Sequence, residues 1–221
     1  MSLTPYLTPT PTVDSDHPAV VAYAEHAIAG QRTERERAIA LYYTIRDGIR
    51  YDGYVIELTS RGLSASYTLE QGRGWCVSKA VLLAACCRVV GIPARLGYAD
   101  VKNHLSTQRM REKMGTDEFY WHGYTDILLE GVWRKATPAF NVELCQKFRL
   151  KPLEFDGTAD SIYHPFDEDG KRHMEYLQYR GEFADVPLAR IKQDFAEQYP
   201  HIENLQRGDF AREVDQETVQ P

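Results

Sequence analysis

The sequence feature that most constrains the fold is a nearly uninterrupted apolar run from Gly74 to Val90, which reads GWCVSKAVLLAACCRVV. Only Ser78, Lys79 and Arg88 are polar within it. A helix that is apolar on every side belongs in the middle of a protein, because no face of it is suited to solvent. Gly91-Ile92-Pro93 follows at once and is typical of a helix end. The run therefore predicts a buried central helix.

The segments around this helix indicate an α+β fold. Two helical patterns precede it, and the second opens with Thr33 and Glu36 in the spacing of a capping box. Strand-like runs follow it, and their tight connections predict antiparallel pairing. We therefore expect a central helix packed on an antiparallel sheet. The expected helices are 17–29, 33–49, 142–148 and 188–199, and the expected strands are 94–101, 119–129 and 132–137, with weaker strand signals near Leu153 and Tyr176.

The remaining segments have few regular signals. Residues 50–73 read as a long loop, and Lys102–Glu118 read as a polar, basic flap, either a solvated loop or a surface for an acidic substrate. At 221 residues the chain is expected to form one domain. We assign residues 1–16 to an extended arm, 17–211 to that domain and 212–221 to a flexible tail.

Composition limits the partners. A formal net charge of −6 argues against nucleic acid, which attracts a basic surface. No apolar run reaches the length of a membrane helix, and the first residues lack the pattern of a signal peptide. We expect a cytoplasmic protein with reduced cysteines, no cofactor and no membrane partner, and the oligomeric state is left open.

The four cysteines differ in position. Cys76 lies at the first turn of the central helix, where the helix dipole and free N–H groups favour a thiolate and suit a developing oxyanion. Cys86 and Cys87 lie deep in the same helix and are best explained as small core residues. Cys145 follows the strands without an identifiable partner. Cys76 is therefore the candidate nucleophile.

A cysteine nucleophile needs a base, and His122 is the candidate because it interrupts an aromatic strand. The turn 129–132 predicts a two-residue hairpin in which Gly131 has a positive φ. In that register His122 faces Ala139, and Tyr124 faces Thr137. Thr137 and Asn141 are then near enough to orient the imidazole.

Asp126 is excluded as the orienting residue by the same register. It lies four residues from His122, about 13 Å along a strand. It also faces Lys135, and a cross-strand ion pair accounts for it. Trp75, Gln71, Trp121 and Tyr124 are the candidate substrate-binding residues near the two reactive side chains.

Four motifs in order resemble the transglutaminase-like superfamily, a group with a papain-like cysteine fold. They are Gly74-Trp75-Cys76, the helix end Arg88–Arg95, the histidine strand Trp121–Tyr124 and the strand Trp133–Pro138. The resemblance covers residues 33–138. The superfamily places an aspartate four residues after the tryptophan of the last strand, and this chain has Thr137 there. Threonine can hydrogen-bond an imidazole but cannot stabilise an imidazolium by charge.

The resemblance implies acyl transfer through a Cys76 thioester on an amide-containing peptide, protein or small molecule, with hydrolysis favoured over acyl transfer to an amine. Either Thr137 or Asn141 then orients His122. Two alternatives stay open. The first is a catalytically inactive binding domain of the same fold. The second is a metal site formed by Cys76, His122 and His104, although no metal-binding spacing supports it.

Overall fold

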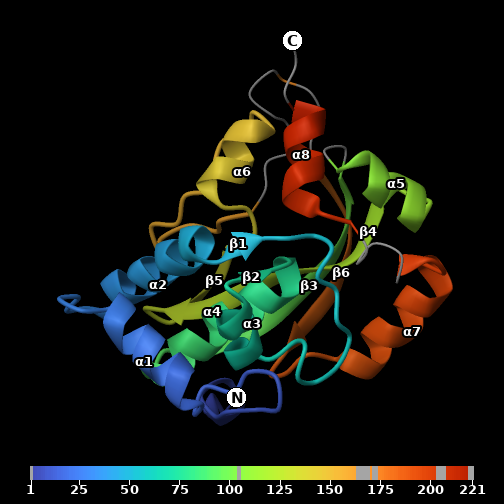
Figure 1. Ribbon diagram of the computed structural model, residues 1–221. Helices are drawn as coiled ribbons and strands as arrows, with labels where there is room; N and C mark the ends of the chain where they lie inside the picture. Colours follow the sequence, from blue (N-terminus) through green and yellow to red (C-terminus); the bar gives the residue numbers. More distant parts are fainter. Residues whose placement is uncertain (1, 104–105, 163–169, 171–173, 203–207, 219–221) are drawn as a thin grey trace.

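The computed structural model describes residues 2–103, 106–162, 170, 174–202 and 208–218. Its centre is a four-stranded antiparallel sheet with strand order β5-β4-β3-β6, and helix α4 lies against this sheet (Figure 1). The predicted α+β class is confirmed. The strands are β3 (Ala94–Asn103), β4 (Glu118–Leu129), β5 (Val132–Ala136) and β6 (Met174–Phe183).

Helix α4 (Cys76–Val89) is the predicted central helix. Every side chain from Cys76 to Arg88 is buried, including that of Lys79. On its other sides α4 contacts three helices, so the apolar character of all its faces is explained by packing. These helices are α1 (Pro18–Ala27), α2 (Glu34–Gly48) and α3 (Ala65–Gln71). The capping box of Thr33 and Glu36 at the start of α2 is confirmed.

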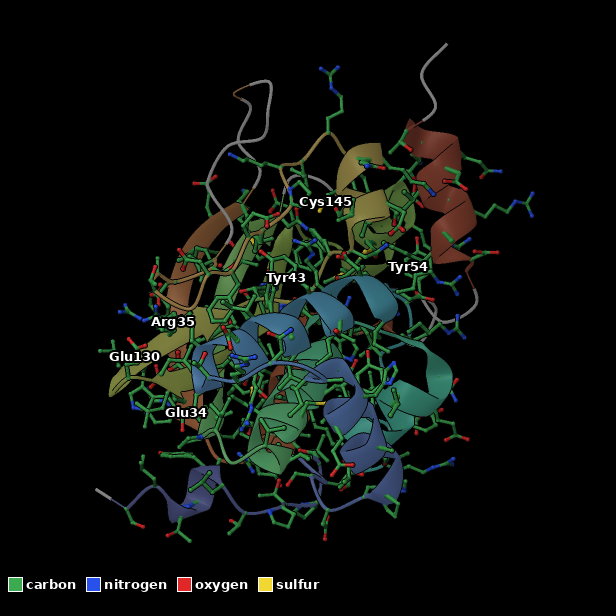
Figure 2. All side chains as sticks on the ribbon, turned by 90° about the vertical axis from the view of Figure 1, so that its left-hand side faces the viewer. Glu34, Arg35, Tyr43, Tyr54, Glu130 and Cys145 are labelled. Atoms are coloured by element: carbon green, nitrogen blue, oxygen red, sulfur yellow. The ribbon has the colours of Figure 1, made fainter. Side chains whose placement is uncertain are left out.

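The hairpin between β4 and β5 has the predicted register near its turn. Leu129 pairs with Val132, and both Glu130 and Gly131 have positive φ angles, 51° and 80°. Glu130 also forms an ion pair with Arg35 at the start of α2, which fixes the turn against the helix layer (Figure 2).

The ladder is shorter than the sequence predicts. It ends at the pair Thr125–Ala136, because Ala136 bridges to Ser161 and the N–H of Thr137 donates to the Ser161 carbonyl (3.1 Å). The predicted pairs of Tyr124 with Thr137 and of His122 with Ala139 are therefore absent from the ladder.

The environment of Asp126 also differs from the expected one. It does face Lys135 across the ladder, but its carboxylate accepts from the Arg95 guanidinium at 2.9 and 3.1 Å. The Lys135 ammonium instead lies over the rings of Tyr124 and Tyr179. An ion pair does explain Asp126, although its partner is on β3 and not on β5.

A β-bulge interrupts β4 directly before His122. The register with β3 shifts between the pairs Ala99–His122 and Val101–Phe119, and Trp121 has a φ of 62°. A left-handed backbone at a bulky residue costs free energy and persists where the surroundings enforce it. The Asp100 carboxylate does so here by accepting the Trp121 N–H (3.1 Å).

Two segments expected to lack regular structure contain helices. The loop 50–73 contains α3, which Ser64 caps, and a parallel pair formed by β1 (Arg50–Tyr51) and β2 (Arg73–Gly74). The flap contains α5 (Gln108–Met114), capped by Thr107. Ser and Thr are strong helix N-caps, so both starts had a local signal in the sequence.

The chain beyond the hairpin adds α6 (Val142–Lys147), α7 (Leu188–Gln198) and α8 (Phe210–Thr218). Helix α8 reaches into the segment assigned to a flexible tail. Its Glu213 carboxylate accepts from the hydroxyl of Tyr54 (2.6 Å), at the base of α8 in Figure 2, and from Arg109 on α5 (2.7 Å). No described helix combines the length and apolar character needed to span a membrane.

Candidate active site

The start of α4 fixes the position of Cys76. Strand β2 ends at Gly74, whose carbonyl accepts the Asp52 N–H (2.9 Å). A Cβ on Gly74 would lie 2.4 Å from the Ser78 hydroxyl, so only glycine fits there. That hydroxyl accepts the Trp75 N–H (3.1 Å) and closes the first turn of the helix. Cys76 is consequently the first residue of α4.

Strand β4 brings His122 to the same end of α4. A Cβ on Gly123 would lie 3.0 Å from the Cα of Val77, so glycine allows the strand to approach the first helical turn closely. The Thr125 hydroxyl donates to the carbonyl of Ala80 (2.8 Å), one turn further along. These two contacts fix the strand segment that carries His122 against the helix that carries Cys76.

Cys76 and His122 line one cavity. It is small, about 40 Å³, and the two residues are only 7% and 6% exposed. Most other lining residues are aromatic, aliphatic or methionine. The full set besides Cys76 and His122 is Tyr51, Gly53, Ile56, Trp75, Val101, Asn103, Met110, Met114, Phe119, Tyr120, Phe140, Met174, Phe195, Tyr199 and Ile202.

Burial dominates the acidity of the Cys76 thiol. It raises the pKa to about 11, although hydrogen bonds from the backbone N–H groups of Gly123, Val77 and Cys76 itself act in the opposite direction. The sequence argument from the helix N-terminus predicted the lowering contribution and omitted the larger burial contribution. At neutral pH the group is therefore a thiol, and it would have to lose its proton in order to act as a nucleophile.

The family assignment follows from the sequence pattern that builds this site. A family model described as the transglutaminase-like superfamily matches residues 21–138, which include the central helix and both strands of the hairpin. The chain belongs to the transglutaminase-like superfamily. No curated protein matches it.

Two solved structures resemble this transglutaminase-like chain. A candidate cysteine protease from Cytophaga hutchinsonii is 22% identical over 62% of the chain, with a TM-score of 0.47. A candidate protease from Parabacteroides distasonis is 14% identical over 57% of the chain, with a TM-score of 0.39. The chain spans 41% and 25% of the lengths of these proteins.

Thr137 and Asn141, the two candidate orienting residues, differ in the hydrogen bonds that their side chains make. The Thr137 hydroxyl oxygen is buried and has no hydrogen-bond partner within the described residues. The Asn141 side chain accepts the Tyr51 N–H (3.1 Å) and donates to the Glu143 carboxylate. The carbonyl and the amine of the Asn141 side chain are therefore both used in contacts with β1 and α6. The Thr137 hydroxyl can still donate one hydrogen bond and accept others.

Of the four candidate substrate-binding residues, only Trp75 lines the cavity of this transglutaminase-like site. Gln71 lines a separate, polar cavity. Trp121 is buried, and its indole N–H donates to Asp194 (2.8 Å). The ring of Tyr124 covers Gly97 on the adjacent strand.

Most of the cavity wall could not be assigned from the sequence, because it comes from segments far apart in the chain. Tyr51 lies at the start of the segment 50–73, Phe140 follows the hairpin, and Phe195 and Tyr199 come from the region of α7. The apolar residues of α5 were hidden by the basic character of the flap. Their spacing, Met110 and then Met114, was the available signal, because residues four apart share one helix face.

A metal site has no support among the described residues, where no cluster of three His, Cys, Asp or Glu side chains occurs. His104, the third ligand considered from the sequence, lies outside the described residues.

Proposed function

We propose that the protein is a cysteine enzyme that cleaves an amide bond through a thioester on Cys76, with His122 as the general acid and base. The observation that carries this proposal is that the first residue of α4 and the histidine of β4 line one cavity. Nucleophile and base must meet in this way for acyl transfer.

The proposed reaction balances as follows. The Cys76 sulfur attacks the carbonyl carbon while its proton passes to His122, and His122 then protonates the leaving amine as the C–N bond breaks. Water attacks the resulting thioester, gives its proton through His122 to the sulfur, and releases a carboxylic acid. The N–H groups at the first turn of α4 are suited to the developing oxyanion.

Hydrolysis is favoured over transfer to a second amine. The cavity volume of about 40 Å³ accommodates water-sized groups. Water is therefore the acceptor that this cavity admits without repacking its wall. The substrate is an amide-containing peptide, protein or small molecule.

We propose Thr137 as the residue that orients His122, because its buried hydroxyl has no partner within the described residues. Thr137→Ala is expected to lower kcat about fivefold with little change in KM, because it removes the hydroxyl that would form a hydrogen bond worth about 1 kcal/mol to His122 during the reaction. Thr137→Ser keeps the hydroxyl and should restore the rate. Equal rates in all three proteins would refute this role.

An inactive binding domain is the second candidate. It is favoured by the neutral Thr137 in place of an aspartate and by the raised pKa of Cys76. The deciding experiment is intact-protein mass spectrometry after incubation with activated esters and amides. An acyl adduct on the wild type that is absent from Cys76→Ala supports the enzyme, and full activity in Cys76→Ala refutes it.

A further inference from the structure

The described part of the wall of the Cys76 cavity carries no Asp, Glu, Lys or Arg side chain. Its polar side chains besides His122 are Asn103 and the tyrosines. A carboxylate or ammonium group placed there would lose its hydration without gaining an ion pair, which is strongly unfavourable. An apolar group would gain free energy by leaving water.

Helix α5 explains why the basic flap does not provide such a charge. Its buried residues are Met110 and Met114, which line the cavity from one face of the helix. Arg109 pairs with Glu213 on α8 (2.7 Å), and Arg111 donates to the backbone carbonyl of Ser106. The expectation that these arginines receive an acidic substrate therefore has no support in the structure.

The methionines also make the cavity adaptable. Met110 and Met114 on α5 and Met174 on β6 supply three thioether side chains to its wall. Methionine is unbranched and fills or vacates irregular space at small cost, so such a wall can repack around an inserted group. The volume of about 40 Å³ can therefore increase through changes in the methionine side chains alone.

We infer that the acyl donor carries an uncharged aliphatic or aromatic group beside the scissile carbonyl, and that this group occupies the methionine-lined cavity. The inference rests on the proposed function of Cys76 and specifies its substrate class. Binding of the group positions the carbonyl carbon over the sulfur at the start of α4.

The test uses p-nitrophenyl esters of acetic, butyric and hexanoic acids, together with the anionic hemiester of adipic acid and the cationic ester of 6-aminohexanoic acid. The readout is kcat/KM divided by the spontaneous hydrolysis rate. We expect it to rise up to about fourfold per added methylene group. The two charged esters should react on the order of 100-fold more slowly than the hexanoate.

Variants on α5 locate the effect. With an octanoate ester added to the series, Met110→Ala should shift the preference beyond hexanoyl, whereas Lys113→Ala, on the same helix but outside the cavity wall, should leave the profile unchanged. Circular dichroism checks that each variant is folded. If a variant does not fold, the ester series on the wild type still tests the proposal.

The outcomes separate the two proposals. No ester turnover above that of Cys76→Ala refutes the proposed function. Turnover that depends on Cys76 but is equal for charged and apolar esters refutes the apolar site and leaves the function standing. A Lys113→Ala profile that shifts as much as that of Met110→Ala would also refute the assignment to this cavity.

Discussion

Lys79 is the most consequential buried charge in the protein, and its titration should be visible in the stability. The side chain is fully buried on α4, one turn beyond Cys76. Its amine donates to the carbonyls of Arg46 (2.9 Å) and Ile49, which ties the end of α2 to the central helix. A neutral amine still has two N–H groups, so both hydrogen bonds survive deprotonation.

Burial lowers the pKa of Lys79 to about 7, whereas the unfolded chain has the ordinary value of 10.5. Between these values the native state has released the proton and the unfolded state still holds it. Stability therefore rises with pH across this window and is lowest below pH 7. From pH 7 to pH 9 the gain is about 2 kcal/mol, because each full pH unit contributes about 1.4 kcal/mol and the first unit is only partly realised.

The assay is urea unfolding of the wild type and of Lys79→Met at pH 7, 8 and 9. The difference in free energy of unfolding between the two proteins should grow by about 2 kcal/mol over this range, with contributions from other titrating groups cancelling. Lys192→Met, at an exposed position on α7, is the matched control and should show no such growth. Parallel curves for the wild type and Lys79→Met would refute the reasoning.

Three further changes test how the site is held together. Gly123→Ala places a Cβ 3.0 Å from the backbone of α4, so we expect a loss of about 1–3 kcal/mol in urea unfolding, and an unchanged midpoint would contradict the close approach. Asp100→Asn breaks the ion pair with Arg180 (2.7 Å) that supports the bulge before His122. This change should lower kcat more than it raises KM. An effect on KM alone would argue against a role of Asp100 in positioning His122. Glu213→Gln weakens the contacts of α8 with Tyr54 and α5. We then expect alkylation of Cys76 to accelerate about tenfold. An unchanged alkylation rate would show that α8 does not limit access of the reagent to Cys76.

The parts of the fold that the sequence predicted are those determined by local patterns. The helix α4 could be predicted from its own residues alone, because a helix that is apolar on every face is stable only when it is buried. The two-residue turn at Glu130 and Gly131 set the register of the hairpin through its own backbone geometry.

The remainder depends on contacts between distant segments. The ladder stops at Ala136 because Ser161, 25 residues further on, takes the next pairing position. The bulge at Trp121 is held by Asp100 from the adjacent strand, and a single sequence gives no sign of this bond. Asn141 appeared equivalent to Thr137 in the sequence, and only the structure shows that its amide is already engaged.

The electrostatics of the site and its departure from the superfamily pattern are mutually consistent. An aspartate beside the histidine stabilises an imidazolium, which is useful when the resting enzyme holds a thiolate. Here burial raises the pKa of the Cys76 thiol to about 11, so the resting site holds no thiolate that an imidazolium would pair with. A carboxylate at position 137, where Thr137 is 1% exposed, would be a buried charge and would cost stability. On the proposed assignment, the neutral threonine therefore suits a site in which charge develops only when an apolar substrate is already bound.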